Sequence, residues 1–203
     1  MKKSVLLLSA ILFTFSMQGQ IQTPASSPSA HMEQMVGLTD VTIEYSRPSM
    51  KGRTVFGNLV PFGKIWRTGA NANTTISFST DVTVDEQKLN KGTYAIYTKP
   101  EKDSWEVYFY SETENGGLPQ KWDDSKVVAK VSAKVYPMSM SVESFTISLD
   151  DLTSESAVLG ILWEKTYVGV KFEVPTDATV MNNINQVMGG PTAQDYYAAA
   201  VYY

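Results

Sequence analysis

The sequence predicts an all-β fold, an antiparallel two-sheet sandwich of jelly-roll type with a short α-helical C-terminal tail. Apolar and polar residues alternate with a period of two in about eight separate runs, which is typical of strands with one buried face. Turn residues separate these runs at short intervals. No helical segment of roughly ten or more residues lies between them to connect parallel strands, so the pattern favours antiparallel pairing.

Residues 1–20 are predicted to be a secretory signal peptide. Lys2 and Lys3 precede an apolar run from Val5 to Phe15, and the segment Ser-Met-Gln-Gly-Gln follows. This run is shorter than the roughly 20 apolar residues of a transmembrane helix, and no later segment reaches that length. We therefore expect a periplasmic or secreted protein without a transmembrane segment.

The sandwich is predicted over residues 37–175. Residues 21–36 are rich in Ser, Pro, Gln and Thr, so we expect an extended lead-in that pairs at most at its end. Large aromatic residues, among them Trp105, Phe145 and Trp163, fall on the inward register of the predicted strands. The alternating runs that define these strands are 41–45, 76–78, 94–96, 105–109, 127–135, 145–149, 159–163 and 168–174.

Residues 176–203 are predicted to form a helical tail. Asp177 is placed to cap a first helix, which the Gly189-Gly190-Pro191 segment ends, and a second helix is expected to start at Thr192. Apolar residues continue to the last position, which indicates an incomplete helical hairpin. We expect this tail to contact a protein partner.

Charge is distributed unevenly along the chain. The formal net charge of −4 becomes −6 once Lys2 and Lys3 are removed, and this acidic balance disfavours nucleic acid as a partner. Residues 45–80 nevertheless contain five basic residues and no acidic one. The chain also has no cysteine, which excludes disulfides and thiolate chemistry.

The five basic residues lie in residues 47–71, which we call the cationic connection. Prolines and glycines accompany them, so they belong to loops, and loops on a rigid scaffold often carry binding groups. Arginine makes forked contacts with carboxylates and phosphates, and a neighbouring tryptophan offers a flat face to a ring. We predict that an anionic small molecule or glycan binds through Arg47, Lys51, Arg53, Trp66, Arg67 and Asn71.

Several short motifs resemble a bacterial family of exported proteins known as the domain of unknown function numbered 2911. The matching residues are Ser27-Pro28, Gly37, Tyr45-Ser46-Arg47-Pro48, Lys51-Gly52-Arg53, Trp66-Arg67-Thr68-Gly69-Ala70-Asn71, Gly92-Thr93-Tyr94, Trp105 and Trp163. The resemblance extends from about residue 27 to 175 and implies export and a tetratricopeptide-like continuation of the tail. The family carries no established activity. It often has an acidic residue after Gly-Ala-Asn, where this chain has Ala72.

Two other functions stay open beside a non-catalytic binding module. One is a carbohydrate-active hydrolase or isomerase, which needs a pair of carboxylates. The spacing selects no pair among Asp85, Glu86, Glu106, Asp123 and Asp124. The other is a purely structural envelope module, in which the connection is only a clasp, meaning a loop that internal hydrogen bonds pin to the rest of the fold. Its three arginines would then pair with carboxylates such as Glu44, Asp81 or Asp150.

The remaining polar and aromatic candidates point to no cofactor and no metal. His31 is the single histidine and lies in the lead-in, and no motif of the common cofactor or hydrolase classes is present. Tyr97, Tyr108 and Tyr110 alternate with expected core positions. They are therefore predicted to line a solvent-exposed face of the sheet.

Overall fold

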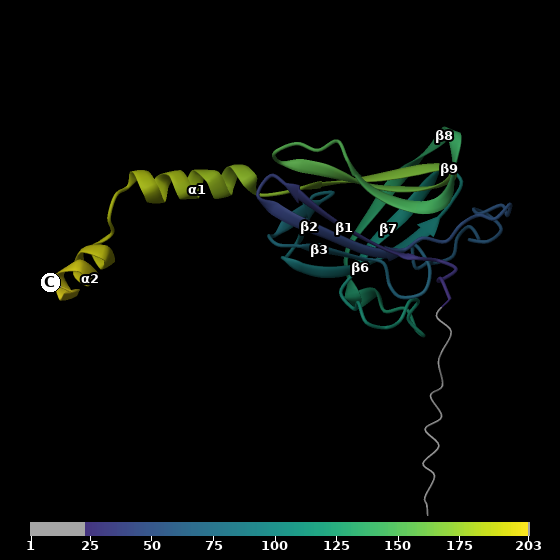
Figure 1. The fold of residues 1–203 in the computed structure, drawn as a ribbon, viewed down its shortest axis with the longest axis horizontal. Coiled ribbons are helices and arrows are strands. Elements are labelled where there is room, and N and C mark those ends of the chain that lie inside the picture. Colours follow the sequence, from purple (N-terminus) through teal and green to yellow (C-terminus); the bar gives the residue numbers. More distant parts are fainter. Residues whose placement is uncertain (1–22, 203) are drawn as a thin grey trace, which may run out of the picture.

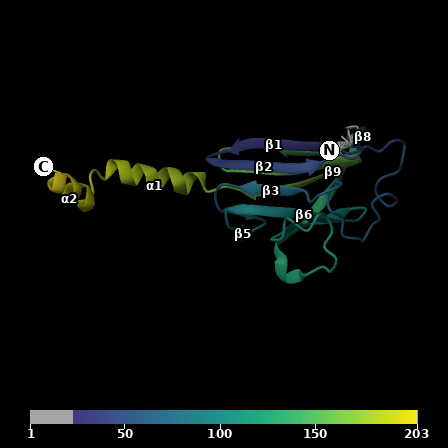
Figure 2. The same cartoon turned by 60° about the horizontal axis from the view of Figure 1, so that its bottom comes forward.

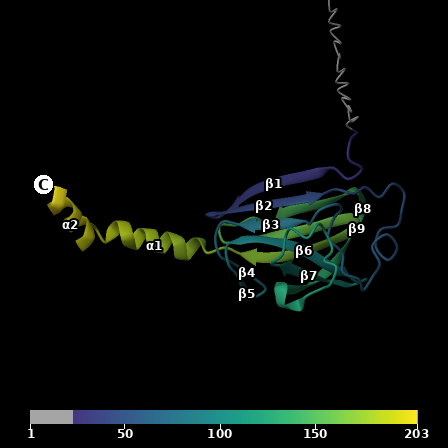
Figure 3. The same cartoon turned by 90° about the horizontal axis from the view of Figure 1, so that it is seen from below.

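The computed structural model describes residues 23–202, so the predicted signal peptide lies outside the described residues. Nine strands pair antiparallel in the order β1-β2-β3-β6-β7-β8-β9-β4-β5. Figure 2 shows β1, β2, β3 and β6 side by side, and Figure 3 shows β4 and β5 as well. The strands are β1 (Ser29–Val36), β2 (Thr39–Ser46), β3 (Thr75–Phe78), β4 (Val82–Val84), β5 (Gln87–Leu89), β6 (Gly92–Pro100), β7 (Ser104–Tyr110), β8 (Val127–Asp150) and β9 (Ser156–Glu173).

The predicted antiparallel, all-β architecture is confirmed, but the strands form one continuous sheet rather than the two separate sheets of a jelly roll. The long strand β8 explains the continuity. Its first part pairs with β7 and its second part pairs with β9. The register shifts between Pro137 and Val142, and again between Val142 and Thr146. Irregularities of this kind bend a strand, so β8 carries the sheet from one half of the fold to the other.

The two halves of the sheet face each other across the main core. The rings of Phe78 on β3 and Phe172 on β9 lie 5.4 Å apart, although three strands separate them in the sheet order. The hydroxyl of Tyr45 on β2 likewise hydrogen-bonds to the backbone of Ile147 on β8. Figure 1 shows β8 and β9 lying over β2, β3, β6 and β7. The predicted core aromatics Trp105, Phe145 and Trp163 are buried between these halves.

The other face of β6 and β7 is also covered, which corrects the prediction of a solvent-exposed tyrosine face. Tyr97, Tyr108 and Tyr110 are buried in a second apolar cluster. The connection of residues 111–126 folds over them, and its Trp122 lies 4.8 Å from the ring of Tyr110. Period-two alternation identifies two faces of a strand, but it does not reveal a loop that returns to cover the second one.

Part of the expected lead-in is a regular strand. β1 pairs with β2 over its whole length, from Ser29 opposite Ser46 to Val36 opposite Thr39. Its side chains alternate between exposed and half-buried until the buried Val36. Strands β4 and β5 were not predicted, because each contains only three residues. Runs this short carry almost no periodicity.

The helical tail consists of α1 (Thr176–Met188) and α2 (Ala193–Tyr202), which extend away from the sheet (Figure 1). Asp177 lies in the first turn of α1 but does not cap it. Thr192 and Asp195 form a reciprocal cap at the start of α2, because each side chain accepts a hydrogen bond from the other's backbone N–H. Neither helix buries a residue against the sheet. Within residues 23–202, no helix has the length and apolar character needed to cross a membrane.

Candidate functional site

A cavity of about 570 Å³ lies beside the cationic connection. The connection leaves β2 and returns to β3 at the end of the sheet opposite α1 (Figures 2 and 3). The chain before β1, the 111–126 connection and β9 complete the wall. The lining residues are Ser26, Ser27, Pro48, Ser49, Lys51, Arg53, Leu59, Val60, Pro61, Lys64, Ile65, Trp66, Arg67, Gly69, Ala70, Asn71, Leu118 and Trp163.

The cationic connection is tied to the sheet near both of its ends. At its start, the carbonyl of Pro48 accepts a hydrogen bond of 2.8 Å from the N–H of Phe145 on β8. Towards its end, Trp66 and Thr98 of β6 exchange two backbone hydrogen bonds of 2.7 and 3.0 Å. The lining residues between these points are therefore carried on a loop with fixed ends.

Trp66 belongs to both the cavity wall and the core. Its ring is stacked on that of Trp163, with centroids 5.9 Å apart and an interplanar angle of 19°. The ring of Phe145 meets it edge-on at 5.2 Å. Its indole N–H donates to the carbonyl of Gly69 at 3.2 Å, so Trp66 also holds the turn that follows it. This packing fixes one wall of the cavity.

The turn after Trp66 has a strained backbone. Thr68 is fully buried and has a φ of +52°, a value that β-branched residues rarely adopt. Its hydroxyl donates to the hydroxyl of Thr98 at 3.1 Å, and its carbonyl accepts a bond of 2.6 Å from the hydroxyl of Thr74. Such strain costs on the order of 1–3 kcal/mol and persists only where surrounding contacts enforce it. The turn is therefore held rigidly by its surroundings.

Arg67 bonds to Asn71 across this turn. The Nη1 atom of Arg67 donates to the carbonyl of Asn71 at 2.9 Å. The side-chain amide of Asn71 donates to the carbonyl of Ser27 at 3.1 Å, which ties the chain before β1 to the cavity. Gly117 packs on the same guanidinium, because a Cβ atom there would lie 2.9 Å from Nη1. The φ of Gly117 is +123°, a backbone angle that favours glycine.

The arginines at the cavity are anchored by carbonyl oxygens rather than by carboxylates. Arg53 donates from Nε to the carbonyl of Met50 at 2.8 Å and from Nη2 to that of Ser49 at 2.7 Å. Among the residues that the structure describes, neither Arg53 nor Arg67 has a carboxylate within ion-pair distance. A neutral carbonyl fixes a guanidinium without cancelling its charge, so both charges are positioned and not neutralised.

The three carboxylates considered as clasp partners have other contacts. Glu44 lies 3.3 Å from the imidazole of His31. Asp81 accepts a hydrogen bond from the backbone N–H of Lys91 at 2.8 Å. Asp150 accepts from the hydroxyl groups of a neighbouring serine and tyrosine. The expected pairing with the three arginines is therefore wrong.

Arg47 is separate from the cavity. Its Nε donates to the carbonyl of Phe145 at 3.0 Å and its Nη2 donates to the hydroxyl of Thr146 at 2.8 Å. These bonds link the end of β2 to β8 across the fold. Of the six residues predicted to bind a ligand, the other five line the cavity.

The cavity has one sign of charge. Four of its lining residues are cationic, namely Lys51, Arg53, Lys64 and Arg67. None of its described lining residues is acidic, although acidic residues outnumber basic ones in the whole chain. Such an arrangement attracts anions, because a concave surface lined by one sign of charge concentrates its field.

The carboxylates considered for catalysis lie elsewhere. Glu106 contacts the ammonium groups of Lys130 and Lys99 and accepts a bond of 2.7 Å from the hydroxyl of Tyr108. Lys130 and then Tyr108 lower the pKa of Glu106 to about 2, so it does not donate a proton at neutral pH. Asp85, Glu86, Asp123 and Asp124 are likewise absent from the lining of the cavity.

His31 lies on β1, away from the cavity. Its imidazole contacts Glu33 at 3.0 Å and Glu44 at 3.3 Å, and the bond to Glu33 raises its pKa most. The described part of the chain contains no group of three or more His, Cys, Asp or Glu residues that could hold a metal ion.

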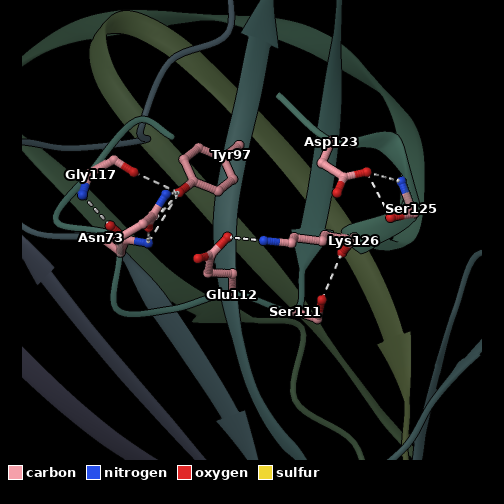
Figure 4. Close-up of polar contacts among 9 residues, drawn as sticks. Asn73, Tyr97, Ser111, Glu112, Gly117, Asp123, Ser125 and Lys126 are labelled. Atoms are coloured by element: carbon pink, nitrogen blue, oxygen red, sulfur yellow. Dashed lines mark hydrogen bonds and ion pairs between the residues drawn. The ribbon is translucent and has the colours of Figure 1, made fainter. Parts of the chain in front are cut away.

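Leu118 is a lining residue that the sequence did not reveal, because it lies far from the cationic connection along the chain. A buried polar network places it (Figure 4). The Tyr97 hydroxyl donates to the carbonyl of Gly117 at 2.6 Å, and the Asn73 side chain bonds to the Gly117 N–H and to Asn115. Burial raises the pKa of Tyr97, so its hydroxyl stays a donor. The network pins the 111–126 connection beside the cavity.

Comparison with known protein families matches residues 27–172 to "Protein of unknown function (DUF2911)". Neither the curated proteins nor the solved structures gave a match. The matched range contains the cationic connection and every lining residue of the cavity except Ser26. It also covers well over half of the 203 residues of the chain. The chain therefore belongs to the DUF2911 family, as its motifs indicated.

Proposed function

We propose that the protein is an exported, non-catalytic binding module that holds an anionic ligand in the cavity beside the cationic connection. The observation that carries this proposal is the composition of the cavity, with four cationic side chains, no described acidic one and a packed tryptophan wall. Its volume of about 570 Å³ falls within the range of small-molecule sites, which is about 300–1,000 Å³. The continuous sheet, whose two halves pack face to face, would serve as the scaffold.

The charges of Arg53 and Arg67, which no carboxylate of the described residues neutralises, support a ligand rather than a clasp. In a clasp, each guanidinium would be neutralised by a carboxylate of the protein itself. Arg53 and Arg67 instead bond to backbone carbonyls and keep their net charge. A carboxylate or phosphate of a ligand would accept charge-assisted bonds from their remaining N–H groups, at little ordering cost, because the side chains are already held. Arg47 alone has contacts of the clasp kind.

A binding role also agrees with the side chains that face the cavity. General acid–base catalysis needs a group that exchanges a proton near neutral pH, such as a histidine or a carboxylate with a raised pKa. The described lining residues include no histidine, aspartate or glutamate. The carbohydrate-active alternative requires two carboxylates facing each other, and no observation in the cavity favours it.

The proposal is tested by isothermal titration calorimetry at low ionic strength with inorganic phosphate, citrate and galacturonic acid oligomers. We expect at least one of these anions to bind the wild type, with an affinity that falls as NaCl is added. Arg67→Ala should weaken binding by about 10-fold or more, because a charge-assisted hydrogen bond contributes about 1.5–3 kcal/mol.

Lys64→Ala provides a second test in case Arg67→Ala fails to fold. Lys64 is exposed, so its removal should spare the fold and weaken binding by about 2- to 5-fold. Lys88→Ala is the matched control, since Lys88 is an exposed lysine on β5 that does not line the cavity. Equal binding by wild type and both cavity variants, or no binding of any of the three anions, would contradict the proposal.

The helical tail is proposed to contact a protein partner, a role independent of the cavity. Val180, Ile184 and Val187 are exposed at helical spacing on α1. Deletion of residues 176–203 is therefore expected to leave anion binding unchanged, which separates the two roles. Loss of anion binding in this deletion variant would contradict their independence.

A further inference from the structure

We infer that the cavity selects amphiphilic anions, in which a phosphate monoester is joined to an apolar chain or ring, in preference to acidic glycans. The inference rests on the proposed function and names the ligand class of the same cavity. Three features of the lining carry it: the amount of positive charge, a pair of exposed leucines and the scarcity of neutral hydrogen-bonding side chains.

The positive charge calls for more than one negative charge on the ligand. Four cationic side chains line the cavity without a described acidic neighbour, so a monoanion would leave most of their mutual repulsion uncompensated. A phosphate monoester carries about −1.5 to −2 charges at pH 7 and presents three acceptor oxygens. It can therefore engage a guanidinium and an ammonium group together. Arg53 and Arg67 are already positioned for this by their carbonyl contacts.

The apolar part of the lining calls for an apolar group on the ligand. Leu59 and Leu118 come from different connections, yet both line the cavity and keep 40% and 43% of their surface exposed. Pro61 and Ile65 extend the same apolar lining. Single exposed leucines are common on protein surfaces, but two that share a cavity create apolar surface that a ligand can remove from water. An alkyl or ring group beside the phosphate would do so.

The described lining has too few neutral polar side chains to bind a ligand rich in hydroxyl groups. It consists of three serines and Asn71, and the Asn71 amide already donates to the carbonyl of Ser27 and the hydroxyl of Ser46. The described lining contains no carboxylate or glutamine to accept hydrogen bonds from sugar hydroxyls. Hydroxyl groups that lose water without gaining partners cost binding free energy, so an acidic glycan fits this cavity poorly.

The test is a calorimetric series of soluble phosphate monoesters, namely methyl, butyl and hexyl phosphate, with inorganic phosphate and trigalacturonic acid for comparison. We expect Kd to fall by up to about fourfold for each added methylene, since a buried methylene contributes about 0.8 kcal/mol. The heat capacity change of binding should become more negative along the series. Hexyl phosphate should bind more tightly than trigalacturonic acid.

Leu118→Ser tests the apolar lining directly. This variant should weaken the binding of hexyl phosphate more than the binding of inorganic phosphate, and so reduce the dependence of Kd on chain length. Leu152→Ser is the matched control, because Leu152 is 49% exposed and does not line the cavity. Vesicles of phosphatidylcholine with and without phosphatidic acid distinguish the source of the phosphate. Sedimentation only with the phosphatidic acid vesicles supports a lipid, whereas binding of hexyl phosphate alone supports a soluble ester.

The failure of this inference differs from the failure of the proposed function. A Kd that does not change with chain length, while inorganic phosphate still binds, overturns the inference and leaves the anion-binding function intact. Tighter binding of trigalacturonic acid than of hexyl phosphate has the same meaning. Absence of binding by every anion in the series overturns both.

Discussion

Gly69 lies in the rigid turn beside the cavity, at a position with little room for a methyl group. Its φ is +149°, and a Cβ atom there would lie 2.9 Å from the hydroxyl of Thr74 and 3.2 Å from the carbonyl of Ser46. The Thr74 hydroxyl cannot easily move away, because it donates a bond of 2.6 Å to the carbonyl of Thr68. Gly69→Ala should therefore combine an unfavourable backbone angle with overpacking.

Gly92 separates these two costs. Its φ is +148°, almost the same as that of Gly69, but a Cβ atom there would meet nothing within 4 Å. Gly92→Ala should carry the backbone cost alone, on the order of 1–3 kcal/mol. Gly69→Ala should lose roughly 1–3 kcal/mol more from overpacking.

Urea unfolding followed by tryptophan fluorescence measures both variants, with thermal unfolding as a second readout. For a chain of this size, the additional loss corresponds to a Tm lower by roughly 2–12 °C in Gly69→Ala than in Gly92→Ala. Equal destabilisation of the two variants would show that crowding does not select glycine in this turn. A larger loss in Gly92→Ala would refute the reasoning altogether.

Three further changes test polar contacts that stabilise the fold. Arg47→Ala should lower the free energy of unfolding by about 1–3 kcal/mol, because its bonds to β8 are lost. It should not change phosphate affinity, because Arg47 does not line the cavity. A weaker phosphate affinity would contradict this expectation. Glu106→Gln should be less stable than the wild type near neutral pH. The pKa of Glu106 is lowered from 4.5 to about 2, so its stabilisation is present above about pH 4.5 and is lost as the pH falls towards 2. Urea unfolding between pH 2 and 7 should show this difference shrinking, and a constant difference would rule the explanation out. Tyr97→Phe should lower the free energy of unfolding by about 1–3 kcal/mol in the same measurement. It should also speed hydrogen exchange at the Gly117 N–H, because it removes the bond that holds the 111–126 connection. Unchanged exchange there would argue against this role of Tyr97.

Most of the strands and the main core could be predicted from the sequence, because both depend on local alternation. A side chain two positions along a strand points to the same face, so the pattern around Trp105 or Phe145 already indicates which residues are buried. The cationic connection was also predictable as a loop, since its glycines and prolines are local signals. Most of the residues predicted to bind a ligand there line the cavity.

The continuous sheet and the second apolar cluster could not be predicted in this way. The bends in β8 depend on where its two partner strands lie, and alternation along β8 alone carries no information about those partners. The burial of Tyr97 and Tyr110 depends on a connection that returns over them with Trp122. Both features arise from contacts between segments that are distant in the sequence.

Local sequence patterns are sufficient to identify the antiparallel strands, the positively charged connection rich in turns and the family of the chain. The folded chain is needed to bring Leu118 and Trp163 to that connection at one cavity. It also sets the bonds of Arg53 and Arg67 to carbonyls rather than to carboxylates. The physical reason is the range of the interactions. Periodicity and turn chemistry act between neighbouring residues, whereas neutralisation of a charge depends on distances that strand pairing sets across the whole fold.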